Sequence, residues 1–454
     1  MTAAALAGLC FAARAQQQQE RPGEPPPAVA PAEAKHGPQS ELGDDDSDLA
    51  AAVGEAEAEL ADAGVPPVPA VVSEVPAAAA NAVVQHMDHL QGLQLWKHAK
   101  LSGGVYTAKT ADGKEAALTV DPNLQAQMEK LLTLYKPVGS AVVALDPRTG
   151  KVLALAEYAA DGKSEGLATK PLYPAASVFK IITGAALLEA GVRPDVETCF
   201  HGGSHGLQEK LLQDKPRVDR RCLSLSMALA KSANVVFAKM AVKHLDAESL
   251  RKEAERFLFN KPIFDQPVEQ SSATIADKGL DFAKSAAGFG QVKLSPLHAA
   301  LIAAAVGNGG VAVEPSMIES VDGEEIPPTG SVRLLNGETA GTLRDMMKLT
   351  VSDGTATSSF RERHKNLLGD ISVAGKTGSL STHGGPFKDY SWFVGFAPAD
   401  EPKIAVAVIV VNGLKWRVHA PFIAREALKA YLVGGPLGQP PVARARHVRR
   451  RKKH

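Results

Sequence analysis

The chain has 454 residues, which is enough for one large domain or two ordinary ones with tails. Its apolar fraction of 45% and aromatic fraction of 5% are those of a soluble globular chain rather than a wholly disordered one. The net charge is zero, but residues 41–62 are acidic and the last eleven residues are basic. The net charge is therefore zero because the charges of the acidic and basic segments cancel, and it gives no information about the residues between them.

The first 15 residues resemble a secretory signal. An apolar run of about twelve residues precedes Ala13-Arg14-Ala15, which has the small-x-small pattern of a cleavage site. The run is too short to span a membrane. A positively charged start is missing, so a disordered alanine-rich end is the alternative. Cys10 does not form a lipoprotein motif, because Leu9 stands where a small residue is needed.

Residues 16–82 are predicted to be a disordered spacer. They hold a glutamine run, Pro25-Pro26-Pro27, the acidic block and further alanine and proline, without a sustained helix or strand period. Proline and charge repulsion should extend this segment. We therefore expect it to hold a domain away from whatever the N-terminus is tethered to.

A short lead-in to the folded part is expected over residues 83–118. It begins with a helix or loop that contains Trp96. A hairpin follows, with strands at 105–108 and 116–120 on either side of a turn at Asp112-Gly113. Ordered structure should therefore begin well after the spacer.

The main domain is predicted over residues 119–434. Asp121-Pro122 opens a helix over 123–135. Five apolar runs read as strands, at 140–145, 152–156, 371–377, 391–396 and 404–411. The patterns between the second and third runs are mostly helical, at 223–231, 235–244, 248–258, 296–306 and 340–351. Strands at both ends with helices between them predict an α/β (α+β) fold, an antiparallel five-stranded sheet flanked by helices. The last helix, 420–432, should cover one face.

The first chemical motif lies in the stretch Tyr173–Thr183. Pro174 suits a chain that enters a helix, and the apolar run continues to Ala190. Ser177 and Lys180 are three residues apart, so they share one helix face near the N-terminus. An amine that can take the hydroxyl proton, beside free backbone N–H groups that can bind an oxyanion, is what a serine nucleophile needs. One such pair alone is common, so the interpretation depends on later motifs.

Two further motifs follow in order. They are Lys231-Ser232-Ala233-Asn234 and Gly375-Lys376-Thr377-Gly378-Ser379. Ser-x-x-Lys, Ser-x-Asn and Lys-Thr-Gly at these separations are typical of penicillin-binding proteins and class A β-lactamases. On these motifs the chain resembles a penicillin-binding protein with a D,D-transpeptidase domain, over about residues 119–432. The segments 288–297, 353–356 and 392–398 also resemble family signatures, with glycines in structural rather than catalytic positions.

The resemblance implies a β-lactamase/transpeptidase-like fold, with the site between the sheet and a helical lobe. Ser177 would attack the D-Ala-D-Ala peptide bond, form an acyl-enzyme and release D-alanine. Lys180 would take the proton, kept neutral by burial and by a second cation, Lys376. Ser232 would relay the proton to the leaving amine, and Asn234 would hold Lys180 and the substrate amide.

The third motif is expected where a strand becomes a loop. In the family, residues at the positions of Lys376, Thr377 and Ser379 meet the substrate carboxylate. Gly378 lets the strand edge approach the substrate closely. The oxyanion hole would be the backbone N–H groups of Ser177 and Ser379. No cofactor and no metal are implied.

Four alternatives stand against a monofunctional transpeptidase. A D,D-carboxypeptidase uses the same residues, and the motifs do not separate the two. A class A β-lactamase needs a Glu-x-x-Leu-Asn segment, which the segment from Glu255 to Asn260 does not match; class D enzymes generally lack the Asn234 equivalent. A penicillin-binding sensor would carry transmembrane helices. A glycosyltransferase domain does not fit in the short sequence before residue 119.

Cys199 and Cys222 bracket a loop that contains His201 and His205. In an exported protein such a pair is expected to form a disulfide. The alternatives are a zinc site from these four residues, although the spacing matches no standard pattern, and free thiols.

The resemblance and the signal-like start together predict a periplasmic or other extracytoplasmic location in a bacterial envelope. The expected partners are peptidoglycan stem peptides, β-lactams and proteins of cell-wall synthesis. The basic tail, 435–454, would contact anionic lipid or wall polymer. It has no aromatic interleaving that would favour nucleic acid.

Overall fold

The computed structural model describes residues 92–264, 268–327, 330–363, 365–382, 386–414 and 418–434. All of them belong to one of the two units into which the chain divides, Asp45–His454. The signal-like segment 1–15, the spacer 16–82, the first residues of the lead-in and the basic tail 435–454 lie outside the described residues.

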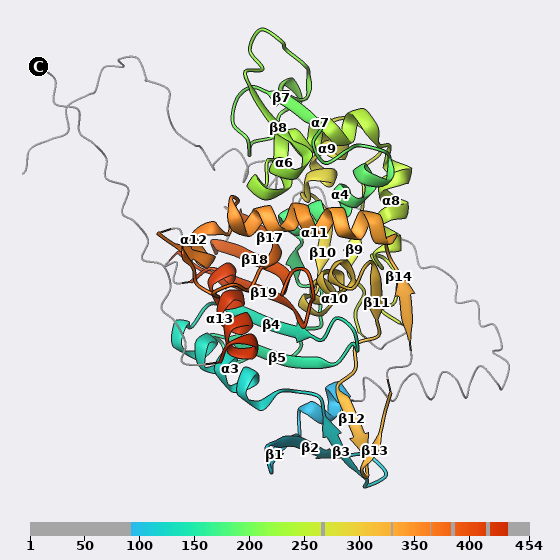
Figure 1. The fold of residues 1–454 in the computed structure, drawn as a ribbon, viewed down its shortest axis with the longest axis vertical. Coiled ribbons are helices and arrows are strands. Elements are labelled where there is room, and N and C mark those ends of the chain that lie inside the picture. The colour runs from blue at the N-terminus through green and yellow to red at the C-terminus, as the bar shows by residue number, and fades with distance from the viewer. Residues whose placement is uncertain are drawn as a thin grey trace, which may run out of the picture. The chain divides into compact units, whose positions relative to one another are not determined.

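A central antiparallel sheet has the strand order β17-β18-β19-β4-β5, which confirms the predicted five-stranded sheet (Figure 1). Its strands are β4 (Gly139–Leu145), β5 (Val152–Ala159), β17 (Ala374–Thr382), β18 (Lys388–Ala397) and β19 (Ile404–Asn412). Side chains of β19 alternate between two cores, with Val406 and Val408 in one and Ala407 and Ile409 in the other. Both faces of the sheet are therefore covered, which explains why this strand is apolar throughout.

Helices cover the two faces of this sheet. One face packs against α3 (Pro122–Tyr135) and α13 (Ala420–Leu432), and the other packs against α10 (Pro296–Gly307). The side chain of Asp121 caps α3 by accepting a hydrogen bond from the Leu124 N–H at 2.7 Å. The helix predicted after Asp121 and the last helix of the domain are both confirmed.

A helical lobe inserts between β5 and β17 in the sequence. Its helices are α4 (Lys180–Glu189), α6 (Leu225–Lys231), α7 (Asn234–His244), α8 (Ala247–Arg256) and α9 (Gly279–Ala287). Helix α11 (Gly337–Ser352) contacts α4 and α6 of the lobe and also β17 of the sheet. Figure 1 shows α11 running between the two. It therefore fixes the lobe against the edge strand of the sheet.

Short elements complete the described part of the chain. The hairpin β7 (Glu197–Phe200) and β8 (Arg221–Ser224) pairs Cys199 with Cys222, and a disulfide joins them. A second five-stranded sheet contains β1 (Lys100–Ser102), β2 (Val105–Lys109), β3 (Glu115–Leu118), β12 (Ile318–Val321) and β13 (Glu324–Glu325). The others are β6 (Tyr173–Pro174), η2 (Ala176–Phe179), α5 (Glu209–Leu212), β9 (Ser272–Ala273), β10 (Val292–Leu294), β11 (Val311–Val313), β14 (Ser331–Arg333), α12 (Thr357–Phe360), β15 (Arg361–Glu362) and β16 (Lys365–Asn366).

Two local predictions were wrong. Pro174 does not lead directly into a helix but pairs with Lys293 in a short sheet, and a 3₁₀ turn precedes α4. The strand predicted at 371–377 instead spans Ala374–Thr382 as β17. The Lys-Thr-Gly motif therefore lies inside a strand rather than where a strand becomes a loop.

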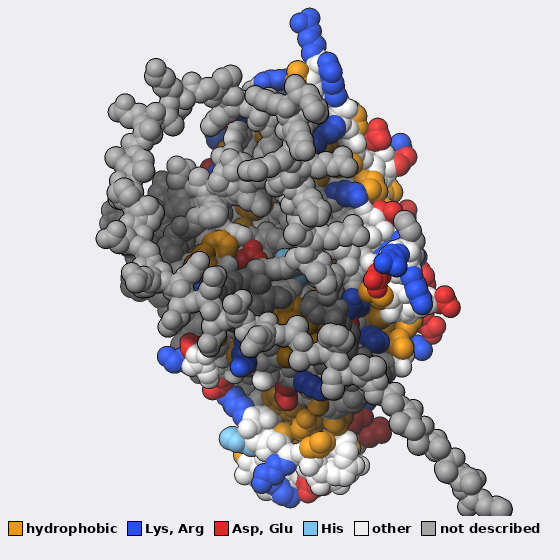
Figure 2. Space-filling model, turned by 90° about the vertical axis from the view of Figure 1, so that its left-hand side faces the viewer, with side chains coloured by type: hydrophobic (Ala, Val, Ile, Leu, Met, Phe, Trp, Pro, Cys, Tyr) orange, Lys and Arg blue, Asp and Glu red, His pale blue; other side chains and the backbone are white. Residues whose placement is uncertain are grey.

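The surface carries charges of both signs. Figure 2 shows Lys and Arg side chains interspersed with Asp and Glu over the described part of one face. Within the described ranges, no helix has both the length and the apolar character needed to cross a bilayer.

Candidate active site

Ser177 lies on the 3₁₀ turn η2, directly before α4. The strand residue Pro174 leads into this turn, and its carbonyl accepts a hydrogen bond from the Trp392 indole N–H at 2.9 Å. The Ser177 side chain is almost buried, with 6% of the residue exposed. The sheet strand β18 thus helps to fix the segment that presents the hydroxyl.

Two non-glycine residues next to the site have left-handed backbone conformations. Ala176 has φ 47° and Ser232 has φ 55°. Such conformations cost about 1–3 kcal/mol and persist only where the surrounding structure enforces them. At Gly288 an added Cβ would lie 2.0 Å from the Ala176 carbonyl oxygen. Close packing therefore holds the backbone before Ser177 in its unusual conformation.

The Lys180 amine lies at the centre of the site. Its Nζ is 2.9 Å from Ser177 Oγ, 2.7 Å from Asn234 Oδ1 and 2.6 Å from the Ala287 carbonyl oxygen. An amide oxygen and a carbonyl can only accept, so they take two N–H groups. A neutral amine has two N–H groups and one lone pair. The lone pair is then left for the Ser177 hydroxyl, which is the arrangement of a general base.

The surroundings of Lys180 favour this neutral form. Burial, and secondly the neighbouring Lys376 cation, lower the pKa of Lys180 well below its ordinary value. The faces of the Phe237 and Phe289 rings lie 5.8 Å and 5.7 Å from its Nζ, an arrangement that by itself attracts a cation and so acts against this shift. A lowered pKa favours the neutral amine, which can take a proton from a hydroxyl.

Asn234 is held at both ends of its amide. Its Oδ1 accepts from Lys180, and its Nδ2 donates to the His205 carbonyl at 2.7 Å. The residue is the first of α7, and only 4% of it is exposed. The loop between β7 and β8, which contains His205, therefore sets the orientation of the amide.

A second pair consists of Ser232 and Lys376. Lys376 Nζ donates to Ser232 Oγ at 2.9 Å and to the Thr377 carbonyl at 2.8 Å. Burial lowers the pKa of Lys376 to about 7. Lys376 can therefore exchange a proton with Ser232 near neutral pH.

The rest of the third motif follows Lys376 along the edge strand β17. Thr377 is buried and its Oγ1 is 2.5 Å from Thr355 Oγ1, whereas Ser379 is exposed. A Cβ at Gly378 would meet Val178 and Trp392 at 3.2–3.3 Å, so this position is close to the segment that holds Ser177. Glycine at this position permits β17 to approach closely the 3₁₀ turn that holds Ser177.

The structure brings five residues of the three motifs into two neighbouring clusters, close enough for the Lys376 cation of one to lower the pKa of Lys180 in the other. Ser177, Lys180 and Asn234 form one, and Ser232 and Lys376 form the other. The sequence interpretation did not include Thr355, although it noted the segment 353–356. It also did not include the carbonyls of Ala287 and His205, because a backbone group leaves no signal in residue identity.

Cys199 and Cys222 are not metal ligands in this structure, since their sulfur atoms are bonded to each other. His201 instead lies 2.5 Å from an Asp219 carboxylate oxygen. Across the described ranges, no group of three or more His, Cys, Asp or Glu side chains is placed to hold a metal. The alternative zinc site is therefore not formed.

Comparison with known proteins is consistent with this geometry. Residues 140–429 match the family model described as the penicillin-binding protein transpeptidase domain. The chain is 27% identical over 379 residues to the peptidoglycan D,D-transpeptidase PbpA of Mycobacterium tuberculosis, covering 73% of this chain and 75% of that protein. It is 28% identical over 353 residues to PbpA of Mycolicibacterium smegmatis, covering 68% and 69%.

Solved structures show the same likeness. The ceftriaxone acyl-enzyme complex of penicillin-binding protein A from M. tuberculosis matches with a TM-score of 0.58 and 26% identity, covering 70% of this chain and 80% of that chain. The penicillin G acyl-enzyme complex of the same protein matches with a TM-score of 0.55 and 26% identity, over the same shares.

Proposed function

The chain belongs to the penicillin-binding protein transpeptidase family, and from this premise we propose that it is a D,D-transpeptidase that cross-links peptidoglycan stem peptides through an acyl-enzyme on Ser177. The observation that carries the proposal is the position of Lys180 Nζ. It contacts Ser177 Oγ while two acceptor groups occupy its N–H groups. This arrangement supplies a base for a serine nucleophile.

The first half-reaction forms the acyl-enzyme. The Ser177 hydroxyl gives its proton to Lys180 while Oγ attacks the carbonyl between the two D-alanines. The negative charge on the carbonyl oxygen is held by the backbone N–H groups of Ser177 and Ser379, each worth about 3 kcal/mol in comparable sites. The C–N bond then breaks, and the ester to Oγ remains.

The leaving amine needs a proton, which Ser232 supplies with Lys376 behind it. The 2.9 Å contact between these two groups supports this role. A pKa of about 7 allows Lys376 to replace the proton that Ser232 gives up. Lys376, Thr377 and Ser379 bind the substrate carboxylate, with Gly378 permitting the approach. An acceptor amine then attacks the ester and restores Ser177.

A β-lactamase is a weaker candidate. Glu255, from the segment nearest to the class A pattern, lies on α8 and is half-exposed. Its carboxylate pairs with Lys261 at 3.3 Å. This is not the setting of a general base that activates water inside a closed site. The acyl-enzyme should therefore be long-lived with β-lactams.

The proposed location is outside the cytoplasmic membrane, where stem peptides are found. A disulfide between Cys199 and Cys222 is consistent with an oxidising compartment. Further partners in cell-wall synthesis, and contact of the basic tail with an anionic surface, stay predictions from the sequence.

The test is a product analysis with a pentapeptide that ends in D-Ala-D-Ala, with and without an acceptor amine. We expect D-alanine release and an aminolysis product that needs the acceptor. Tetrapeptide alone in both reactions would indicate a carboxypeptidase, and no D-alanine release would contradict the proposal. Lys180→Met, which keeps the apolar stem and removes the base, should release none.

A further inference from the structure

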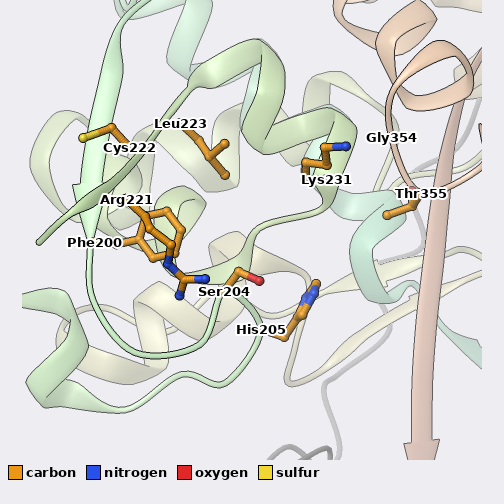
Figure 3. A pocket seen from close by; sticks show the side chains of 9 residues that line it. All are labelled: Phe200, Ser204, His205, Arg221, Cys222, Leu223, Lys231, Gly354 and Thr355. Atoms are coloured by element: carbon orange, nitrogen blue, oxygen red, sulfur yellow. The ribbon is translucent and has the colours of Figure 1, made fainter. Parts of the chain in front are cut away.

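A cavity of about 560 Å³ lies beside the clusters described above. Three separate segments form it, namely the β7–β8 hairpin with its loop, the end of α6, and the turn after α11 (Figure 3). Its lining residues are Phe200, Ser204, His205, Arg221, Cys222, Leu223, Lys231, Gly354 and Thr355. None of them belongs to the residues assigned above to acyl transfer.

The lining is basic. It contains the cations Arg221 and Lys231 and the imidazole of His205, and none of its nine residues is acidic. The Arg221 guanidinium stacks on Phe200, with its carbon 4.9 Å from the ring centroid, and donates one N–H to the Gly202 carbonyl. Stacking on the ring fixes the orientation of the planar guanidinium, and the N–H donors of a guanidinium match the geometry of a carboxylate. The cavity therefore favours an anionic group.

Three connections place the cavity on one side of the site. The carbonyl of the lining residue His205 accepts a hydrogen bond from Asn234 Nδ2 at 2.7 Å. Thr355 contacts Thr377 at 2.5 Å, and Lys231 directly precedes Ser232. The cavity thus adjoins the part of the site where Ser232 and Thr377 lie.

That part is where the second substrate has to enter. If Ser232 protonates the amine that leaves, the amine that attacks must arrive at the same position, because the second half-reaction reverses the first with a different amine. In this step the new C–N bond forms, the bond from carbon to Ser177 Oγ breaks, and the amine proton returns to that oxygen. A carboxylate on the acceptor can then bind either where the leaving D-alanine carboxylate was held, at Lys376 and Thr377, or in the adjoining cavity. Variants of Arg221 distinguish the two sites, because a preference that Arg221→Gln leaves intact would assign the carboxylate to Lys376 and Thr377.

We propose that this cavity binds a carboxylate of the acyl acceptor, with Arg221 as the specificity-determining residue. This inference rests on the proposed transpeptidase function. It predicts that the enzyme selects acceptor amines that carry a carboxylate near the amine, and that this selection arises after the acyl-enzyme has formed.

The experiment uses two acceptor amines matched in amine pKa, one with a carboxylate and one with a neutral amide in its place. A thioester analogue of the acyl donor is supplied, and the ratio of aminolysis to hydrolysis is measured for each acceptor. We expect wild type to favour the carboxylate acceptor and Arg221→Gln to lower this preference about tenfold, the effect of losing one charge-assisted contact. Arg221→Lys should restore part of it.

The matched control is Arg220→Gln, which removes the same charge from the neighbouring exposed residue outside the cavity lining. It should keep the wild-type preference. Equal use of both acceptors by wild type would overturn the inference without any variant, as would the same loss in Arg220→Gln and Arg221→Gln. Absence of acylation by the donor in wild type would instead contradict the proposed function.

Discussion

Lys180 illustrates how the surroundings of a side chain decide its chemistry. The same amine on an exposed helix would be charged at neutral pH and could not accept a proton. Here burial and the Lys376 cation disfavour the charge, and the acceptors Asn234 and Ala287 orient the lone pair. The proposed base therefore depends on groups that lie far from it in the sequence.

The pKa of Lys376, about 7, predicts a pH dependence of acylation. Below this pH the amine is charged and can bind a carboxylate; above it the charge is lost. Burial and the Lys376 cation lower the pKa of Lys180 well below its ordinary value, which favours its role as base. We expect the second-order rate constant for acylation by penicillin to fall as the pH rises above about 7.

This profile can be measured from pH 5 to 10 at constant ionic strength. Lys376→Gln should acylate more slowly and lose the fall on the basic side, since it has no proton to lose. A rate constant that keeps rising up to pH 10 in the wild type would contradict the role given to Lys376.

At the site, residue identity predicted the side chains but not all of their partners. Ser177, Lys180 and Asn234 could be named because their order and spacing are distinctive. The carbonyls of Ala287 and His205 could not, since every residue has a carbonyl and only the fold selects which one accepts from the Lys180 amine and which one from the Asn234 amide. The left-handed conformation of Ser232 has no sequence signal either.

Among the elements, β17 shows why glycine is ambiguous in a sequence. The strand that contains Gly375 was predicted to end at residue 377, directly before Gly378, but β17 continues to Thr382. At Gly375 an added Cβ would lie 2.3 Å from the ring of Phe393, which is fully buried. The glycine leaves room for an aromatic ring on the neighbouring strand. A single sequence does not distinguish a glycine that forms a turn from one that makes room for a neighbouring side chain.

Gly375→Ala should therefore destabilise the protein by about 1–3 kcal/mol, because the ring has no free space to move into. The matched control is Gly341→Ala in α11, where the new Cβ meets nothing within 4 Å. That change should stabilise by about 0.5–1 kcal/mol. Urea unfolding of both variants measures the difference, and equal effects of the two would contradict this account of β17.

The hairpin β7–β8 was not predicted, because its strands have only four residues each. It nevertheless connects helix α7 of the lobe to the loop between its two strands. Lys239 of α7 donates to the Cys199 carbonyl at 2.8 Å and pairs with Asp219 at 3.3 Å. The disulfide closes the loop from which both acceptors come.

Replacing both cysteines by alanine should lower the free energy of unfolding by about 3 kcal/mol, given the sequence separation of 23 residues. Thermal unfolding of the double variant, beside wild type with and without dithiothreitol, measures this. Wild type in reductant should approach the variant. A melting temperature that neither change lowers would mean that the bond contributes nothing to stability.

For the molecule as a whole, the antiparallel sheet and its covering helices could be predicted, because long apolar runs and helical periods are strong signals. The sheet also explains how the site assembles. Strands β4 and β5 precede the helical lobe in the sequence and β17 follows it, so closing one sheet brings Lys376 back to the segment that holds Ser177. Short strands such as β9 to β16 could not be predicted, since tertiary contacts define them.

The proposed reaction requires that Ser177 is the acyl-accepting hydroxyl of this assembled site. The most direct measurement is mass spectrometry of the protein after incubation with benzylpenicillin, followed by peptide mapping. We expect a single penicilloyl adduct on the peptide that contains Ser177, and no adduct in a folded Ser177→Ala variant. An adduct on another residue, or labelling that survives in Ser177→Ala, would contradict it.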